Sequence, residues 1–316
     1  MEDPQGEGGG RVAVEDSPER AQPARVPLPA TVEEVQRLLR SQAYLADRGI
    51  ATAVLLALSL RQPLLLEGEA GVGKTEVAKA LAAGLGVRLV RLQCYEGIDA
   101  SQALYEWDYA RQLLHLRALS ERDAAGERAV EELFGPRFLV ERPLLEALRA
   151  GDGALLLIDE IDRADDEFEA FLLEVLSDFQ ITIPEVGTIR AEHPPAVILT
   201  SNRTRELHDA LKRRCLYHWI EHPDLEREVE VVRMRAPEVS ESLARSVASA
   251  VGRLRELDLA KRPGVAETLG WARALSFLRV DSLDRGAVED TLGSVVKDHD
   301  DLVLVREALD RVLGGG

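Results

Sequence analysis

A glycine-rich stretch at residues 68–76, GEAGVGKTE, carries the residue types and spacing that bind a phosphate chain. Gly68, Gly73, Lys74 and Thr75 satisfy the pattern GxxxxGKT. In this pattern glycines let backbone amides surround the phosphates, the lysine neutralises their charge, and the hydroxyl holds magnesium. We therefore expect Lys74 to contact the β- and γ-phosphates of a nucleotide and Thr75 to ligate Mg²⁺. The same loop supplies the remaining expected phosphate contacts, which are Glu69, Ala70, Gly71, Val72 and Glu76.

Residues 154–160 read ALLLIDE, an apolar run that ends in two carboxylates. Because side chains alternate along a strand, Asp159 and Glu160 are expected to point in different directions and to have different roles. Asp159 suits the magnesium shell, usually through water, and Glu160 suits orienting or deprotonating an attacking water. Such a pair can also simply end a strand and begin a turn. Its position after a phosphate-binding loop and an apolar strand favours the catalytic interpretation.

Other nucleotide chemistries fit the sequence less well. The NKxD tetrapeptide that would recognise guanine does not occur, and a glutamate directly after Asp159 is not the usual arrangement of a nucleoside kinase. ATP is therefore the expected nucleotide and hydrolysis the expected reaction.

Short apolar runs separated by segments of helical spacing predict a parallel sheet covered by helices on both faces. The candidate strands are residues 64–66, 89–94, 154–158, 196–200 and 216–220. Residues 181–191 alternate in polarity and turn at Pro184 to Gly187, which predicts a small hairpin. The fold class is therefore α/β.

The chain divides into three parts by pattern. Residues 1–30 are rich in glycine and proline and lack apolar periodicity, so we expect a flexible tail. Residues 31–225 carry the alternating pattern of strands and helices. Residues 226–316 predict a small all-helical lid domain, in three or four segments broken at Pro237, Gly264 and Gly286.

The ordered motifs GEAGVGKT, LLLIDE, VILTSN and ALKRRC resemble those of the AAA+ ATPases, and their details resemble the MoxR group. The stretches LQCYEGIDASQALYEWDYARQLL and GVAETLGWARAL are similar to the CoxD-like branch of that group. The resemblance covers residue 31 to the end of the helical part. It implies a P-loop domain with a helical lid, ATP and Mg²⁺ as cofactors, and a ring, usually a hexamer, with ATP between subunits.

The resemblance also implies roles for residues outside the loop and the acidic pair. Asn202 matches the sensor 1 position, where an amide contacts the γ-phosphate or its water; the carboxyl end of a sheet strand is also where open α/β sheets bind ligands. Alone, Asn202 could equally be a turn residue. Arg213 and Arg214 match the arginine-finger region, where one cation reaches the neighbouring subunit's site. Which of the two does so is left open, and both could be a solvated pair at a helix end.

The sequence departs from the family pattern at two places. Asp162 stands where related sequences, written DEINRA or DEANRA, have asparagine, and this departure argues against a trans role for Arg163. Glu267 and Thr268 stand where a sensor 2 arginine is expected, with Arg273 as a weak substitute a turn or two later. We therefore expect weaker coupling between nucleotide and lid.

Two further clusters have simpler explanations than a ligand site. Cys215, His218 and His222 resemble part of a zinc pattern, but on a strand such offsets do not converge. The acidic residues within 162–169 are expected to form a solvated helix start.

The aromatic residues Tyr105, Trp107 and Tyr109 could stack on nucleic acid bases. They lack interleaved basic residues, so packing of an inserted segment is the expected role.

The net charge of −17 and pI near 4.9 also oppose nucleic acid and anionic membrane surfaces as partners. The longest apolar run, residues 50–60, is too short to span a membrane, and two cysteines make no disulfide framework. These features favour a cytoplasmic location.

The expected function is that of an ATP-hydrolysing MoxR-type ATPase that remodels or matures a partner protein or metalloenzyme. The resemblance implies a partner with a von Willebrand factor A (VWA) domain, in addition to copies of the chain itself. One alternative is a nucleotide-dependent interaction module with little turnover. The other is a DNA-directed AAA+ subunit, which the acidic charge opposes.

Overall fold

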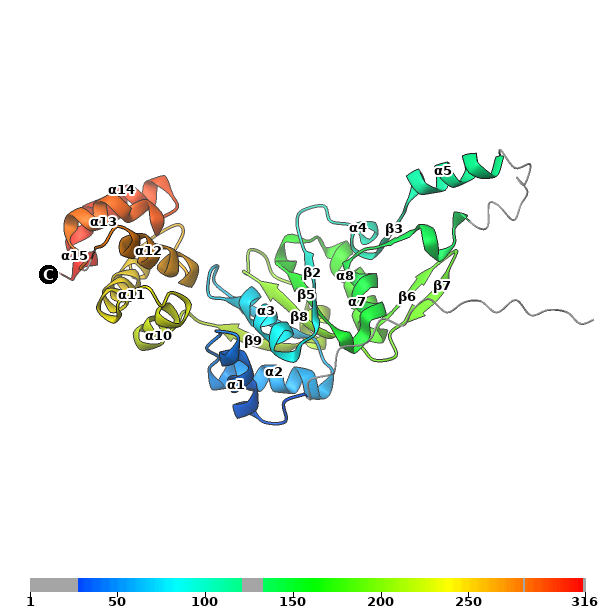
Figure 1. The fold of residues 1–316 in the computed structure, drawn as a ribbon, viewed down its shortest axis with the longest axis horizontal. Helices are drawn as coiled ribbons and strands as arrows, with labels where there is room; N and C mark the ends of the chain where they lie inside the picture. The colour runs from blue at the N-terminus through cyan, green and yellow to red at the C-terminus, as the bar shows by residue number, and fades with distance from the viewer. Residues whose placement is uncertain (1–27, 121–132, 281, 315–316) are drawn as a thin grey trace, which may run out of the picture.

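A parallel sheet forms the centre of the computed structural model, which describes residues 28–120, 133–280 and 282–314 (Figure 1). Its five strands lie in the order β2-β5-β8-β1-β9, and every neighbouring pair is parallel. The strands are β1 (Leu64–Gly68), β2 (Arg88–Gln93), β5 (Ala154–Asp159), β8 (Ala196–Ser201) and β9 (Leu216–Ile220). The predicted α/β fold and the five predicted strands are confirmed.

Helices cover both faces of the sheet, as the apolar strands require. On β5, a strand with a neighbour on each side, Leu155 and Leu157 pack with the helices of one face, while Leu156 and Ile158 pack with those of the other. This alternation follows from the period of two in a strand. The first face carries α1 (Val32–Ser41), α2 (Arg48–Leu60) and α3 (Lys74–Leu85). The second carries α4 (Ala100–Leu104), α7 (Pro143–Ala150), α8 (Asp166–Asp178) and α9 (Asp209–Arg214).

Two small antiparallel pairs stand outside the main sheet. The predicted hairpin is confirmed as β6 (Gln180–Ile183) paired with β7 (Gly187–Arg190). The other pair is β3 (Tyr105–Trp107) with β4 (Leu139–Glu141), and α5 (Tyr109–Ser120) follows β3. Short 3₁₀ turns are η1 (Pro136–Phe138), η2 (Gly151–Gly153) and η3 (Ile161–Arg163).

The predicted aromatic packing holds for part of the cluster. Trp107 is buried and meets Phe134 edge to face, with ring centroids 5.3 Å apart, and Tyr105 packs on Trp107 at 6.1 Å. Tyr109 is exposed instead, because it begins α5 on the side away from the core.

The helices after the sheet lie together as a group (Figure 1), and their side chains form a core of their own. They are α10 (Leu225–Arg235), α11 (Glu241–Arg255), α12 (Val265–Phe277), α13 (Arg285–Thr291), α14 (His299–Glu307) and α15 (Leu309–Leu313), with the 3₁₀ turn η4 (Leu292–Ser294) after α13. At the centre of this core Trp271 is fully buried, and its indole nitrogen donates to Thr291 Oγ1 at 2.7 Å.

The predicted breaks at Pro237 and Gly264 are confirmed, but the helices outnumber the three or four expected. The predicted break at Gly286 is wrong, since Gly286 lies inside α13. The chain breaks earlier, and Asp284 caps α13 by accepting from the amide of Ala287. The predicted tail, residues 1–30, lies outside the described residues except for its last three. Across the part of the chain that the structure describes, no helix has the length and apolarity to cross a membrane.

Candidate nucleotide-binding site

The loop between β1 and α3 has the backbone shape that its glycines allow. Gly71 and Gly73 have φ of 80° and 99°, in the left-handed region where glycine is favoured. Lys74 begins α3, and its Nζ donates to the carbonyl oxygens of Gly68 at 2.8 Å and Glu69 at 2.7 Å. Burial lowers the pKa of Lys74 to about 8, although nearby carboxylates oppose the shift. The amine is therefore mostly protonated at neutral pH.

A cavity of about 670 Å³ lies at the carboxyl ends of β1, β5 and β8. Loop residues 70–76, Asp159, Glu160 and Asn202 all line it, so most of the predicted site residues share one cavity. Gly68 and Glu69 are not part of the lining and instead accept the bonds from Lys74. Apolar side chains complete the lining, among them Ile50, Ile220 and Leu269. Polar groups beside an apolar wall suit the phosphates and the base of a nucleotide.

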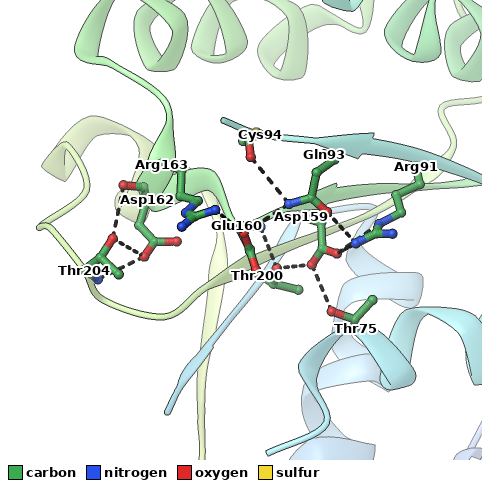
Figure 2. Close-up of polar contacts among 10 residues, drawn as sticks. All are labelled: Thr75, Arg91, Gln93, Cys94, Asp159, Glu160, Asp162, Arg163, Thr200 and Thr204. Atoms are coloured by element: carbon green, nitrogen blue, oxygen red, sulfur yellow. Dashed lines mark hydrogen bonds and ion pairs between the residues drawn. The ribbon is translucent and has the colours of Figure 1, made fainter. Parts of the chain in front are cut away.

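Asp159 ends β5 beside the first turn of α3 (Figure 2). Its Oδ1 accepts from Thr75 Oγ1 at 3.0 Å and from Thr200 Oγ1 at 2.5 Å, and its Oδ2 accepts from Arg91 Nε at 3.0 Å. A hydroxyl and a carboxylate side by side are the hard oxygen ligands that Mg²⁺ prefers, with phosphates and water supplying the rest. Among the described residues there is no cluster of three or more His, Cys, Asp or Glu suited to a metal. Thr75 and Asp159 offer two oxygens, so they fit Mg²⁺ as part of a shell that phosphate and water oxygens would complete.

Glu160 follows β5 with φ of 56° and ψ of 50°, a left-handed conformation that is costly for a residue with a side chain. Its amide donates to Thr200 Oγ1 at 2.9 Å, which helps to hold this backbone. Its carboxylate accepts from Gln93 Nε2 at 3.2 Å and pairs with Arg163 at 3.5 Å (Figure 2). Backbone strain of this kind clusters at functional sites. The carboxylate lines the cavity, where it is suited to accept a proton from water.

The remaining predicted residues lie in two different places. Asn202 directly follows β8 and is half-buried in the cavity lining. Arg213 and Arg214 end α9, are exposed, and stand outside that lining. Arg214 donates to the carbonyl oxygen of Leu173 at 3.1 Å. The structure thus brings Asn202 to this chain's own cavity and leaves the two arginines on the surface.

The expectation of a solvated acidic segment at 162–169 is wrong for two of its members. Asp162 and Glu169 are buried, because the turn η3 and the first turn of α8 direct them inward. Asp162 accepts from the amide and hydroxyl of Thr204 at 2.9 Å and 2.7 Å, and Glu169 pairs with Arg205. These contacts join the segment after β5 to the segment after β8.

The positions considered for sensor 2 do not face the cavity. Arg273 donates to Glu238 at 3.2 Å and to the carbonyl oxygen of Arg235, and it stands outside the lining. Thr268 is buried and donates to Glu228 at 2.6 Å within the helical core. Arg273 as a substitute is therefore not supported by its position.

Two arginines of α10 line the cavity instead, and the sequence interpretation missed them. Arg227 pairs with Asp47 at 3.1 Å, and Arg235 pairs with Glu76 at 3.0 Å. The available signal was topological: α10 follows β9, and β9 pairs with β1, which leads into the phosphate-binding loop. This connection brings α10 near the loop, and Arg227 and Arg235 are the α10 cations on the cavity side, whereas Arg233 pairs with Glu241.

Cys215 lies apart from His218 and His222, which line one cavity. Burial raises the pKa of the Cys215 thiol to about 12, which makes it a poor metal ligand. His218 and His222 both line the cavity, so these two of the three side chains do share a site. His222 also contacts Glu69 at 3.1 Å, and burial is the chief cause of its lowered pKa.

The phosphate-binding loop touches the helical region directly. The amide of Val265, the first residue of α12, donates to the carbonyl oxygen of Gly71 at 3.0 Å. Gly264 lies so close that a Cβ there would stand 2.5 Å from Gly71 Cα. Glu69 adds a contact of 3.3 Å with Arg262. Movement of the loop and movement of α12 are therefore mechanically linked.

Gly264→Ala should displace α12 from the loop, because its Cβ would overlap backbone that cannot move aside cheaply. We expect ATP affinity to fall about tenfold, as measured by calorimetric titration, an effect within the range of overpacking costs. Gly270→Ala is the matched control, since Gly270 lies inside the helix that Gly264 caps and a Cβ there meets nothing within 4 Å. Equal ATP affinity in both variants would show that the contact does not couple to the site.

The parallel sheet, the glycine-rich loop and the acidic strand end together define a P-loop nucleotide-binding protein with an AAA+ fold. Residues 63–215 match the family model described as AAA domain (dynein-related subfamily). Residues 63–215 therefore form an AAA+ ATPase domain.

Similar proteins cover the chain to different extents. An uncharacterized protein of Staphylococcus haemolyticus is 22% identical over 284 residues, which are 86% of this chain and 99% of that protein. Chaperone protein ClpB 2 of Parasynechococcus marenigrum is 29% identical over 185 residues, or 54% of this chain. The match spans only 18% of that chaperone. Among solved structures, the Holliday junction branch migration motor RuvB of Thermotoga maritima is 18% identical with a TM-score of 0.44, covering 87% of this chain and 74% of that one.

Proposed function

We propose that this chain is an ATP-hydrolysing MoxR-type AAA+ ATPase of the CoxD-like branch, which works as a ring and remodels or matures a partner protein. The observation that carries the proposal is the convergence of Lys74, Thr75, Asp159, Glu160 and Asn202 on one cavity at the carboxyl ends of the strands. These residues supply every role that phosphoanhydride hydrolysis requires within one subunit.

Each residue has a definite task in this proposal. Loop amides and Lys74 bind the β- and γ-phosphates, and Thr75 with Asp159 holds magnesium. When bound there, magnesium would supply neutralisation of the charge that develops on the phosphate oxygens. Glu160 orients the attacking water and accepts its proton, while the amide of Asn202 binds the γ-phosphate or that water.

The proposal of a ring is based on Arg213 and Arg214. Both are exposed at the end of α9 and stand outside this chain's own cavity, which suits a cation that acts on the neighbouring subunit. An arginine supplied in trans can raise phosphoryl-transfer rates about 10³- to 10⁵-fold. We propose a hexamer in which one of the two reaches the next subunit's ATP.

The output of hydrolysis is proposed to be mechanical. ClpB relatives carry the name chaperone, and the MoxR-like motifs support a client protein or metalloenzyme and a partner with a VWA domain. Contact between the phosphate-binding loop and α12 offers a route from nucleotide state to a change of surface. A cytoplasmic location, with neither membrane nor nucleic acid as partner, completes the proposal.

One observation favours the alternative of an interaction module with little turnover. Arg273 stands outside the cavity, so the expected sensor 2 cation is not supplied by that residue. Arg227 and Arg235 line the cavity from the helical side and oppose this alternative, because they offer positive charge close to the loop. Turnover measurements separate the two.

The test is ATP turnover per subunit against protein concentration, alongside sedimentation with and without ATP and Mg²⁺. We expect turnover per subunit to rise steeply as rings assemble. Replacing the arginine that acts in trans, Arg213 or Arg214, by alanine should then lower ATP turnover about 10³-fold, while ATP binding and assembly persist. Flat turnover from a monomer would contradict the ring, and tight binding with negligible turnover would favour the interaction module. Stimulation by DNA at low salt would favour the DNA-directed alternative.

A further inference from the structure

Arg91 lies against the carboxylate that is expected to serve magnesium. It belongs to β2, the strand paired with β5, and its Nε donates to Asp159 Oδ2 at 3.0 Å (Figure 2). A second guanidinium nitrogen bonds the same oxygen, so both donors converge on Oδ2. The side chain of Arg91 is 48% exposed, whereas that of Asp159 is 3% exposed. A half-exposed cation thus neutralises a buried anion.

The hydrogen-bonding capacity of Asp159 is largely used within the chain itself. Thr75 and Thr200 donate to Oδ1, and Arg91 donates to Oδ2. A buried carboxylate needs such compensation, because leaving its charge unpaired costs several kcal/mol. A divalent cation would provide the same compensation. A guanidinium and a magnesium ion repel each other, so they cannot both bind one carboxylate at full strength.

We propose that Arg91 is a positioning residue that competes with magnesium for Asp159 and thereby sets the affinity of the site for the metal. This rests on the proposed function, in which Asp159 and Thr75 hold Mg²⁺ with the nucleotide. Because Arg91 is half-exposed, its guanidinium can turn toward solvent when the metal arrives. By linkage, the Arg91–Asp159 ion pair lowers the affinity for the metal by the same factor by which the bound metal weakens the ion pair.

Replacement of Arg91 by the metal at Asp159 would also affect the carboxylate of Glu160. Arg91 donates to Gln93 Oε1, and Gln93 Nε2 donates to Glu160 Oε2 at 3.2 Å. Arg91, Gln93, Asp159 and Glu160 therefore form one bonded group (Figure 2). Release of Arg91 by the metal removes one of the bonds that orient Gln93, and with it part of the restraint on Glu160.

The test measures metal binding directly, with Mn²⁺ in place of Mg²⁺. The full chain is saturated with ADP, Mn²⁺ is titrated, and free Mn²⁺ is read from its electron paramagnetic resonance signal. We expect Arg91→Met to bind Mn²⁺ about tenfold more tightly than the wild type, a size that allows for solvent screening of a half-exposed ion pair. Arg91→Lys, which keeps the charge but loses the paired donors, should fall between them.

Arg88→Met is the matched control, since Arg88 is an exposed arginine of the same strand that pairs with Glu146 instead. It should bind Mn²⁺ like the wild type. Unchanged or weaker Mn²⁺ binding in Arg91→Met overturns the proposal. If thermal unfolding shows that Arg91→Met does not fold, unchanged Mn²⁺ binding in Arg91→Lys overturns it.

The same titration separates this proposal from the proposed function. A wild-type chain that binds neither ADP nor Mn²⁺ with ADP overturns both. ADP and Mn²⁺ binding that is indifferent to residue 91 overturns only the competition.

Discussion

Lys74→Met should lose at least about 100-fold in ATP affinity, because charge-assisted bonds to phosphate are among the strongest that a side chain makes. Lys74 is buried at the start of α3, and its amine already reaches the carbonyl oxygens of Gly68 and Glu69. Methionine keeps the apolar stem but removes the charge, so packing beside the loop is largely conserved. Calorimetric titration with ATP and Mg²⁺ measures the effect.

Lys79→Met provides the control for this variant. Lys79 lies in the same helix, is exposed, and pairs with Glu76 at 2.7 Å, so the change removes an equal charge without touching the loop carbonyls. It should keep ATP affinity within about twofold, as expected for an exposed ion pair. Retention of ATP affinity by Lys74→Met would contradict the assignment of the loop as the phosphate site.

Glu160→Gln should lower ATP turnover by about 10²- to 10⁴-fold, the range that general-base catalysis supplies. The amide retains the shape of the side chain and can still bond Gln93, but it cannot accept a proton from water. ATP binding should therefore remain near the wild-type affinity. Phosphate release and calorimetric titration, made on the same preparation, separate the two effects.

Glu167→Gln is a suitable comparison, because Glu167 is an exposed residue in the first turn of α8. It should turn over ATP like the wild type. Full activity in Glu160→Gln would exclude Glu160 as the base. Negligible turnover in the wild type itself, unchanged by this substitution, would support an interaction module that responds to nucleotide occupancy.

Much of the fold followed from local pattern. Apolar runs predicted the strands because β5 and β1 are buried on both faces, and such strands must be apolar throughout. The interruption at Gly286 was read wrongly because a glycine in an exposed first turn costs a helix little when Asp284 caps it. The prediction of a solvated acidic segment at 162–169 is wrong for Asp162, because its burial depends on Thr204, which lies in the segment after β8.

The phosphate-binding loop, the acidic pair and the alternation of strands and helices can all be predicted from the amino-acid order, since each depends on residues adjacent in the chain. The packed fold was needed to show that Arg91 neutralises Asp159, that Arg227 and Arg235 rather than Arg273 line the cavity, and that Gly264 contacts the loop. These contacts join residues far apart in sequence. Their existence depends on strand order and on how α10 and α12 pack, and neither is encoded in any local period or spacing.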